Sequence, residues 1–364
     1  MSVSIVVGGQ YGSESKGKVV SLLAKAVGVN CAVVRCGGPN SGHIVVEHGK
    51  EYCFRLLPAG VVYGRRGFLA PAMALDLTVL KREIDTYQVG PDLLTVDPFS
   101  VVITEEMKTA EVPLVSAISS TGSGTGVATA AKCLRNPAPA LIKDILGEHE
   151  WLRPYVRDVR GEVNNLIDDG HRVIVEGTQG FGLSLHHSRM YPQTTSKDTT
   201  AAQFCMEAGL SPLLVDEVVL VVRTFPIRVA GEQAGPLKNE ITWEKLQEEA
   251  GFPHGLTEVT TVTRKRRRVA RFDPDVVKDA CQVNRPTAIA VHGLDYLGFE
   301  NQGKRHFGEL NKQAQEFLEN LRELTGVPIK YCFTGRSNSD VIADVDSEIG
   351  TTDPKVSWQL KKVA

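Results

Sequence analysis

The chain has 364 residues, of which 42% are hydrophobic and 23% are charged, and its formal net charge is −2. This is the composition of an ordinary globular protein, and it gives no reason to expect a nucleic acid or a membrane as the main partner. Seven scattered cysteines without a C-x-x-C pair, no signal peptide and no apolar run of about 18 residues predict reduced thiols and a cytoplasmic location.

The first predicted element is a strand at 3–7, a short β-branched run that ends in two glycines. Apolar residues then recur at helical spacing over 19–26, and Gly28 marks the predicted end of that helix. A strand, a glycine-rich loop and a helix are typical of the first arm of a parallel α/β unit.

Strands and helices alternate along the rest of the chain. Strand-like runs lie at 31–34, 171–175, 218–222, 287–291 and 329–333, with helical patterns between them, for example at 243–250 and 311–325. This alternation predicts an α/β fold with a mainly parallel central sheet covered by helices. Because no internal repeat or convincing linker interrupts it, we expect residues 1–364 to form a single large domain.

The loop after the first strand resembles a phosphate-binding loop. Gly12 to Val19 read G-S-E-S-K-G-K-V, which fits G-x-x-x-x-G-K except that valine replaces the metal-binding Ser or Thr. Glycines let backbone N–H groups approach an anion, the following helix adds a favourable dipole, and Lys16 and Lys18 add charge. A surface turn is the alternative, but the position between strand and helix favours phosphate binding.

Four later segments also combine glycines with polar or charged side chains. The segment R-C-G-G-P-N-S-G-H ends in His43. Its glycines have no side chains that would shield the imidazole from a ligand, although a lone histidine is more often structural. S-S-T-G-S-G-T-G (119–126) is a second possible phosphate cradle or else a flexible linker. V-E-G-T-Q-G (175–180) projects Glu176 and Gln179 from a strand end, where open α/β sheets bind ligands. The basic segment at 260–272 fits small anions better than a nucleic-acid patch, a targeting signal or a solvated face.

In this order the segments resemble the adenylosuccinate synthetases. The motifs are G-Q-Y-G-S-E-S-K-G-K, G-G-P-N-S-G-H, S-T-G-S-G-T-G, E-G-T-Q-G, Y-P-Q-T-T-S, the arginine-rich segment and a late T-G-R, and they extend from Val3 to about Asp340. The resemblance implies a fold related to the P-loop NTPases and a C–N ligase that joins aspartate to inosinate (IMP) at the expense of GTP. Such enzymes phosphorylate the purine 6-oxygen, and the aspartate amine then displaces that phosphate.

The resemblance also implies roles for individual residues. His43 would be the general acid at the 6-oxygen, and Ser13 occupies the position of the family's catalytic base. Ser13 and the Gly42 carbonyl would bind Mg²⁺. The purine nucleotide would contact Ser13, Asn40, Thr121, Arg135, Gln179, Thr195 and Val229, with Arg135 supplied by the second subunit of a homodimer. The triphosphate nucleotide would contact Gly12, Glu14, Ser15, Lys16, Gly17, Lys18, Gly42, Asp295, Thr334 and Gly335. Aspartate would contact Val262, Thr263, Lys265 and Arg267.

Three departures from the family pattern alter the expected substrates. Ser13 replaces the aspartate that removes the N1 proton of inosinate, and losing a general base normally costs roughly 10²–10⁴ in rate. The family's base-reading T-K-L-D becomes H-G-L-D (292–295), which weakens the argument for GTP, and Lys265 replaces an arginine near the ribose 2′-OH. These changes resemble a phage branch of the family, the 2-aminoadenylosuccinate synthetases, which take dGMP, aspartate and ATP or dATP and lead to 2-aminoadenine in DNA.

Guanine carries a 2-amino group beside N1. Ser13 is shorter than aspartate and leaves room for this group, and its hydroxyl can accept a hydrogen bond from it. We therefore expect a dGMP-using, ATP- or dATP-dependent ligase in the host cytoplasm of a phage. Two alternatives stay open: an ordinary synthetase that uses IMP and GTP, and a nucleotide- or RNA-binding protein that has lost catalysis. Retention of His43, Asn40 and Gln179 speaks against the last. The residues leave the N1 base open, and Glu14 is a candidate by adjacency alone.

Overall fold

The fold is built on a central β-sheet in the computed structural model, which describes residues 2–260 and 265–348. Within these residues the sheet has nine strands. They are β1 (Val3–Gly8), β2 (Cys31–Arg35), β5 (Arg66–Leu69), β7 (Leu94–Val96), β9 (Arg172–Glu176), β10 (Val215–Arg223), β14 (Ala288–His292), β15 (Ile329–Phe333) and β16 (Val341–Ala343).

The strands follow the order β16-β15-β14-β10-β1-β9-β2-β5-β7, and neighbours are parallel except for β15 and β16. All six residues of β1 are buried, as expected for a central parallel strand that has helices on both faces. The predicted α/β fold with a mainly parallel sheet is thus confirmed.

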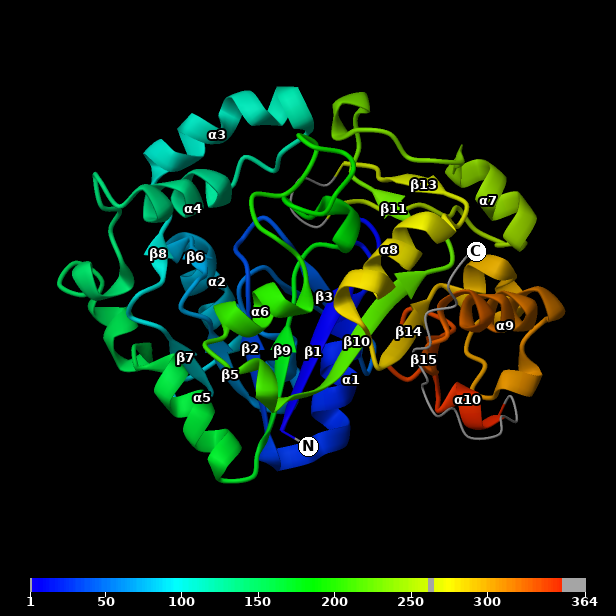
Figure 1. The fold of residues 1–364 in the computed structure, drawn as a ribbon, viewed down its shortest axis with the longest axis horizontal. Helices are drawn as coiled ribbons and strands as arrows, with labels where there is room; N and C mark the ends of the chain where they lie inside the picture. Colours follow the sequence, from blue (N-terminus) through cyan, green and yellow to red (C-terminus); the bar gives the residue numbers. More distant parts are fainter. Residues whose placement is uncertain (1, 261–264, 349–364) are drawn as a thin grey trace, which may run out of the picture.

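Helices alternate with these strands and cover the sheet. α1 packs on β1, β2 and β9, α5 and α6 also pack on β9, and α8 packs on β10. In Figure 1, α5, α6 and α8 lie in front of the sheet, and α3 and α4 lie beyond its upper end. The helices are α1 (Lys16–Val27), α2 (Leu77–Tyr87), α3 (Glu105–Ile118), α4 (Thr125–Leu134), α5 (Val159–Asp168), α6 (Ala201–Glu207), α7 (Trp243–Ala250), α8 (Pro274–Asn284), α9 (Lys312–Thr325) and α10 (Val345–Glu348).

Shorter strands form three small sheets outside the central one. The hairpin of β3 and β4 is antiparallel, β6 and β8 pair in parallel, and β13 lies between β11 and β12. Their bounds are β3 (His43–Glu47), β4 (Lys50–Phe54), β6 (Ala74–Leu75), β8 (Val101–Val102), β11 (Ile227–Arg228), β12 (Glu240–Ile241) and β13 (Arg268–Ala270).

The carboxyl ends of the parallel strands bring the sequence motifs together. β1 leads into the phosphate-like loop, β2 into the loop of His43, and β9 into the E-G-T-Q-G loop, with β1 paired to β9 and β9 to β2. In Figure 1 the amino terminus lies at the opposite end of the sheet from α3, β11 and β13. Loops distant in sequence therefore meet at one edge, where ligands of parallel α/β sheets bind.

No helix in the described part of the chain has both the length and the apolar character needed to cross a membrane.

Candidate active site

The loop after β1 is held in shape by its own carboxylate, Glu14. Its Oε1 accepts hydrogen bonds from the backbone N–H groups of Gln10 (3.1 Å) and Gly12 (2.7 Å), and its Oε2 lies 2.8 Å from Lys16 Nζ. Both charged side chains are only 1% exposed. Glu14 and Lys16 therefore shape the loop from inside, and neither lines the neighbouring pockets.

Glycine is required where the E-G-T-Q-G segment crosses this loop. A Cβ at Gly180 would lie 2.5 Å from Gly12 N and 2.6 Å from Gln10 O, which are backbone atoms that cannot rotate away. The close approach puts Gln179 beside the loop, with φ of 60°. The two segments thus form one continuous wall.

A pocket beside the first half of the loop, here called the loop pocket, gathers most of the residues expected at the purine nucleotide and aspartate. Segments that follow β1, β2, β9 and β11 meet there with the 119–121 turn and the basic segment. Sequence reasoning did not single out Tyr11, Leu183 and Ala230, because nothing in their spacing separates them from core residues. The expected residues in its wall are Gly12, Ser13, Asn40, Gly42, Thr121, Gln179, Val229, Lys265 and Arg267.

His43 follows Gly42 of this wall, at the start of β3, and lies in a buried cluster of charges. Its Nδ1 contacts Glu176 Oε1 and the Arg35 guanidinium, and Arg35 Nη1 donates to Glu176 Oε1 over 2.8 Å. Burial, and then the adjacent Arg35, lowers the pKa of His43 to about 4. The imidazole is therefore neutral at neutral pH, and Glu176 fixes the orientation of its ring.

A second pocket, the aromatic pocket, lies beside the other half of the loop. The expected triphosphate residues Ser15, Lys18, Asp295 and Gly335 line it, together with Phe252 and Tyr296. Lys18 Nζ donates to the Gly335 carbonyl (2.6 Å) and lies 4.5 Å from the ring centre of Phe333. Burial lowers the pKa of Lys18 to about 8, so it still carries a charge for phosphate at neutral pH.

Two arginines share one carboxylate between the two pockets. Glu258 Oε1 accepts from Arg223 Nη2 (2.5 Å) and Tyr296 OH (2.8 Å), and its Oε2 accepts from Arg267 Nη1 (3.2 Å). Burial opposes ionisation, but Arg223 and then Arg267 hold the pKa of Glu258 below its usual range. Arg223 Nη1 also donates to the Ser13 carbonyl (3.0 Å), and Arg267 lines both pockets. The sequence motifs did not indicate Arg223 or Glu258, which meet only through the fold.

Thr195 lies in a third, smaller pocket. Asn40 and Gln179 line both this pocket and the loop pocket, so the two are neighbouring parts of one site. Thr125 Oγ1 is buried there without a hydrogen-bond partner among the described residues. Such an unpaired hydroxyl suits a ligand oxygen.

The remaining expected residues lie away from these walls. Gly17 is in the first turn of α1 against His43, and Thr334 is fully buried, with its hydroxyl donating to the Lys304 carbonyl (2.8 Å). Arg135 is exposed at the end of α4. Val262 and Thr263, expected at aspartate, fall outside the described residues.

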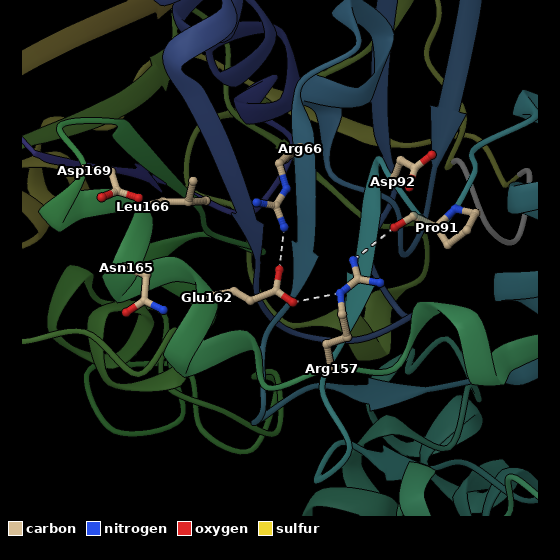
Figure 2. A pocket seen from close by; sticks show the side chains of 8 residues that line it. All are labelled: Arg66, Pro91, Asp92, Arg157, Glu162, Asn165, Leu166 and Asp169. Carbon is tan, nitrogen blue, oxygen red and sulfur yellow. Dashed lines mark hydrogen bonds and ion pairs between the residues drawn. The ribbon is translucent and has the colours of Figure 1, made fainter.

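Another depression, of about 490 Å³, lies at the amino end of β5, away from these loops. Figure 2 shows Arg66 and Arg157 both directed at Glu162, and Arg157 Nε lies 2.7 Å from a Glu162 oxygen. Three acidic side chains, Glu162, Asp92 and Asp169, line this depression together with the two guanidinium groups, so it is not a site of net positive charge for an anion. None of the expected site residues lines it.

The residues at the loop pocket fit a magnesium ion held mainly by substrates. Gly42 and Ser13 line the same pocket and offer a carbonyl and a hydroxyl oxygen. Mg²⁺ prefers oxygen ligands and commonly takes several from phosphates and water. Within the described residues, no group of three or more His, Cys, Asp or Glu side chains could hold a metal unaided.

Comparisons with known proteins show which family this chain is similar to. A family model described as adenylosuccinate synthetase matches residues 5–140 and 137–302. The adenylosuccinate synthetases of Methanocaldococcus jannaschii and Pyrococcus horikoshii are 37% and 36% identical to this chain, over 92% and 93% of its length and 94% and 97% of theirs.

Two solved structures share the fold. Fully ligated adenylosuccinate synthetase from Plasmodium falciparum superposes with a TM-score of 0.84 at 20% identity, covering 94% of this chain and 100% of that chain. Succinoaminodeoxyadenylate synthetase of cyanophage S-2L, bound to dGMP and to dATP as an energy donor, superposes with a TM-score of 0.79 at 28% identity, covering 96% and 97%.

Proposed function

Because the chain belongs to the adenylosuccinate synthetase family, whose members are C–N ligases, we propose that it joins L-aspartate to dGMP with hydrolysis of ATP or dATP. The donor's terminal phosphoryl group passes to the guanine 6-oxygen, and the donor diphosphate leaves. The aspartate amine then attacks C6 and displaces inorganic phosphate. The product, 2-amino-2′-deoxy-N6-succinyladenylate, is a precursor of 2-aminoadenine for DNA.

The observation that carries the choice of dGMP is Ser13 in the wall of the loop pocket. Its small side chain stands where the family resemblance places an aspartate, and it leaves space for a 2-amino group. No Asp, Glu or His side chain among the described residues lines this pocket. A purine with an amino group beside N1 suits such a wall better than a purine that depends on a carboxylate there.

The cyanophage enzyme supports this choice, because it was solved with dGMP and dATP and matches nearly the whole of this chain. A phage origin, and with it the cytoplasm of a host cell, belongs to the same proposal.

In this reaction His43 acts as the general acid that stabilises the 6-oxygen, held by Glu176 at Nδ1. The negative phosphoryl group that arrives near the imidazole favours its protonated form, against the burial that lowers its pKa. The Gly42 carbonyl and Ser13, together with substrate phosphates, would hold Mg²⁺, which would supply charge neutralisation.

Other residues bind the donor phosphates, the aspartate and the dGMP phosphate. Lys18 binds the donor phosphates beside Gly335, and Lys265 and Arg267, with Val262 and Thr263, bind the aspartate carboxylates. Arg135, exposed at the end of α4, contacts the dGMP phosphate of a second subunit, which makes the active form a homodimer.

A second candidate is the ordinary reaction of the family, which joins aspartate to IMP with GTP. It is favoured by the archaeal relatives, which carry the name adenylosuccinate synthetase at 36–37% identity. Asp295 would favour it too if its carboxyl were ionised, because a carboxylate accepts two hydrogen bonds from guanine.

One assay separates the two candidates. Purified protein with Mg²⁺ and aspartate is given dGMP or IMP, each with ATP, dATP or GTP, and succinyl adducts are identified by mass spectrometry. We expect an adduct from dGMP with ATP or dATP. An adduct from IMP with GTP but none from dGMP would establish the second candidate, and no adduct from any pair would exclude both.

Gly17→Ala should lower turnover by about 10²-fold, because a Cβ there would lie 2.7 Å from His43 Cβ and displace the imidazole. The effect should appear in kcat more than in KM for dGMP. Gly90→Ala is a matched control, since its added methyl group meets nothing within 4 Å. Equal turnover in the two variants would show that the position of His43 does not limit the reaction.

A further inference from the structure

The two halves of the phosphate loop face different pockets, which suggests where each nucleotide base lies. Gly12 and Ser13 line the loop pocket, whereas Ser15 and Lys18 line the aromatic pocket. A triphosphate that lies along Lys18 places its base in the aromatic pocket, which has a volume of about 420 Å³ and includes the ring of Phe252. This step rests on the proposed function, in which that base is the adenine of the phosphoryl donor.

Asp295 lines this pocket and has one carboxyl oxygen, Oδ1, without a partner among the described residues. It lies in the 3₁₀ helix η8 (Leu294–Leu297), directly after β14, and is only 7% exposed. Its Oδ1 is buried and has no hydrogen-bond partner among the residues that the structure describes. Leaving a buried polar atom unpaired is unfavourable, so a base that pairs with it gains more than it would at an exposed carboxyl.

Burial shifts the titration of Asp295 towards neutral pH. Burial raises its pKa to about 6, although Arg223 and Lys18 oppose the shift. Burial also lowers the pKa of His292 far below its usual range, so that this neighbour stays uncharged. A base that covers the pocket excludes more water and favours the neutral acid further. The ionisable groups near Asp295 come from α1, β10, β14, η8 and the segment before β13, and they are Lys18, Arg223, His292, Tyr296 and Glu258.

The protonation state of a carboxyl group decides which purine it can pair with. Adenine presents an N6 amino donor beside the N1 acceptor, whereas guanine presents two donors, N1–H and the 2-amino group. A neutral carboxylic acid has one acceptor and one donor and matches adenine, while a carboxylate has two acceptors and matches guanine.

We infer that Asp295 selects the phosphoryl donor as a neutral carboxylic acid, which donates its O–H to adenine N1 and accepts a hydrogen bond from the N6 amino group. It is thus a residue that determines donor specificity in an ATP- or dATP-dependent member of this family. Above the pH at which the carboxyl loses its proton, the same side chain favours guanine.

The inference predicts that the preference for adenine depends on pH. The affinities of the full-length protein for adenylyl and guanylyl imidodiphosphate, which are not hydrolysed, are measured by calorimetry with Mg²⁺ between pH 5.5 and 7.5. The adenine complex holds one proton more than the guanine complex, so the ratio of adenine to guanine affinity should fall about tenfold per pH unit. The ratio cancels effects on the phosphates, and the range stays below the pKa of Lys18, which burial lowers to about 8.

Asp295→Asn provides the sharper test, because an amide offers adenine the same donor and acceptor at every pH. Its affinity for the adenine analogue should equal or exceed that of the parent at pH 7.5, its affinity for the guanine analogue should fall at least tenfold, and the ratio should lose its pH dependence. Glu51→Gln is the matched control. It makes the same carboxyl-to-amide change at an exposed position of the same pocket and should keep the pH dependence.

A pH-independent ratio in the parent, a tenfold loss of adenine affinity in Asp295→Asn, or a flat ratio in Glu51→Gln would each overturn the role of Asp295. These results are distinct from a failure of the proposed function. If the guanine analogue binds and the adenine analogue does not at any pH, the ATP-dependent reaction itself is wrong. If the adenine analogue binds with a pH-independent ratio, only the inference about Asp295 fails.

Discussion

His43→Ala should lower the turnover of dGMP, aspartate and ATP by about 10²–10⁴-fold, the usual contribution of a general acid. The reason lies in the position of His43 at the start of β3, against the first turn of α1 and next to Gly42. The loss should fall on kcat, because no expected nucleotide contact is removed from the pocket walls. It is measured by the rate of succinyl adduct formation at saturating substrates.

The fold should survive this substitution, because Arg35 and Glu176 stay paired with each other at 2.8 Å when the imidazole is removed. Thermal unfolding of the variant tests this point. His171→Ala, which lies just before the amino end of β9 and far from the loops, should keep full activity. Unchanged turnover in a folded His43→Ala protein would remove His43 from the mechanism.

Ser13→Asp should lower kcat/KM for dGMP by at least about tenfold, because a longer, charged side chain crowds the 2-amino group. The loop has little freedom to yield, since Arg223 Nη1 holds the Ser13 carbonyl at 3.0 Å and Glu14 holds the N–H of Gly12. The relative use of IMP should rise, because its C2 carries only hydrogen. The ratio of kcat/KM for dGMP and IMP measures the effect.

Two companion variants separate bulk from charge at this position. Ser13→Asn matches aspartate in size without the charge, and Ser13→Ala keeps the space but removes the hydroxyl. If crowding dominates, the asparagine variant should lose dGMP use as the aspartate variant does, while the alanine variant loses much less. A Ser13→Asp enzyme that uses dGMP as well as the parent would refute the steric argument for this residue.

The elements that sequence reasoning located are long or strongly patterned. The strand at 3–7 and the strands at 31–34 and 329–333 correspond to β1, β2 and β15, and the helix at 243–250 corresponds to α7. The run at 218–222 lies in the buried part of the longer β10, whose first residue is half-buried and whose second is exposed, so that these two lack the buried pattern. The short strands β7 and β16, each of three residues, carry too few positions for a periodic signal.

The residues of the candidate site also divide into those that a local sequence pattern reveals and those that have no such pattern. Glycine-rich segments at strand ends identified Ser13, Asn40 and Gln179 because each loop carries its own pattern. Glu258 could not be found in this way, since an isolated glutamate carries no local signal. Its importance arises only when the fold brings it against Arg223, 35 positions away along the chain. Residues that act through contacts of this kind become visible only in three dimensions.

The cluster of Arg223, Glu258 and Arg267 also bears on the stability of the protein. Two guanidinium groups face one carboxylate, and the Nε atoms of both arginines are buried without partners among the described residues. Uncompensated charge and unpaired donors of this kind make the empty state less stable than the same fold with an anion in place. Anionic substrates should therefore raise the free energy of unfolding as they bind, since a ligand that prefers the native state shifts the folding equilibrium towards it. The substrate would thus complete the folded structure between the two pockets as well as undergo reaction there.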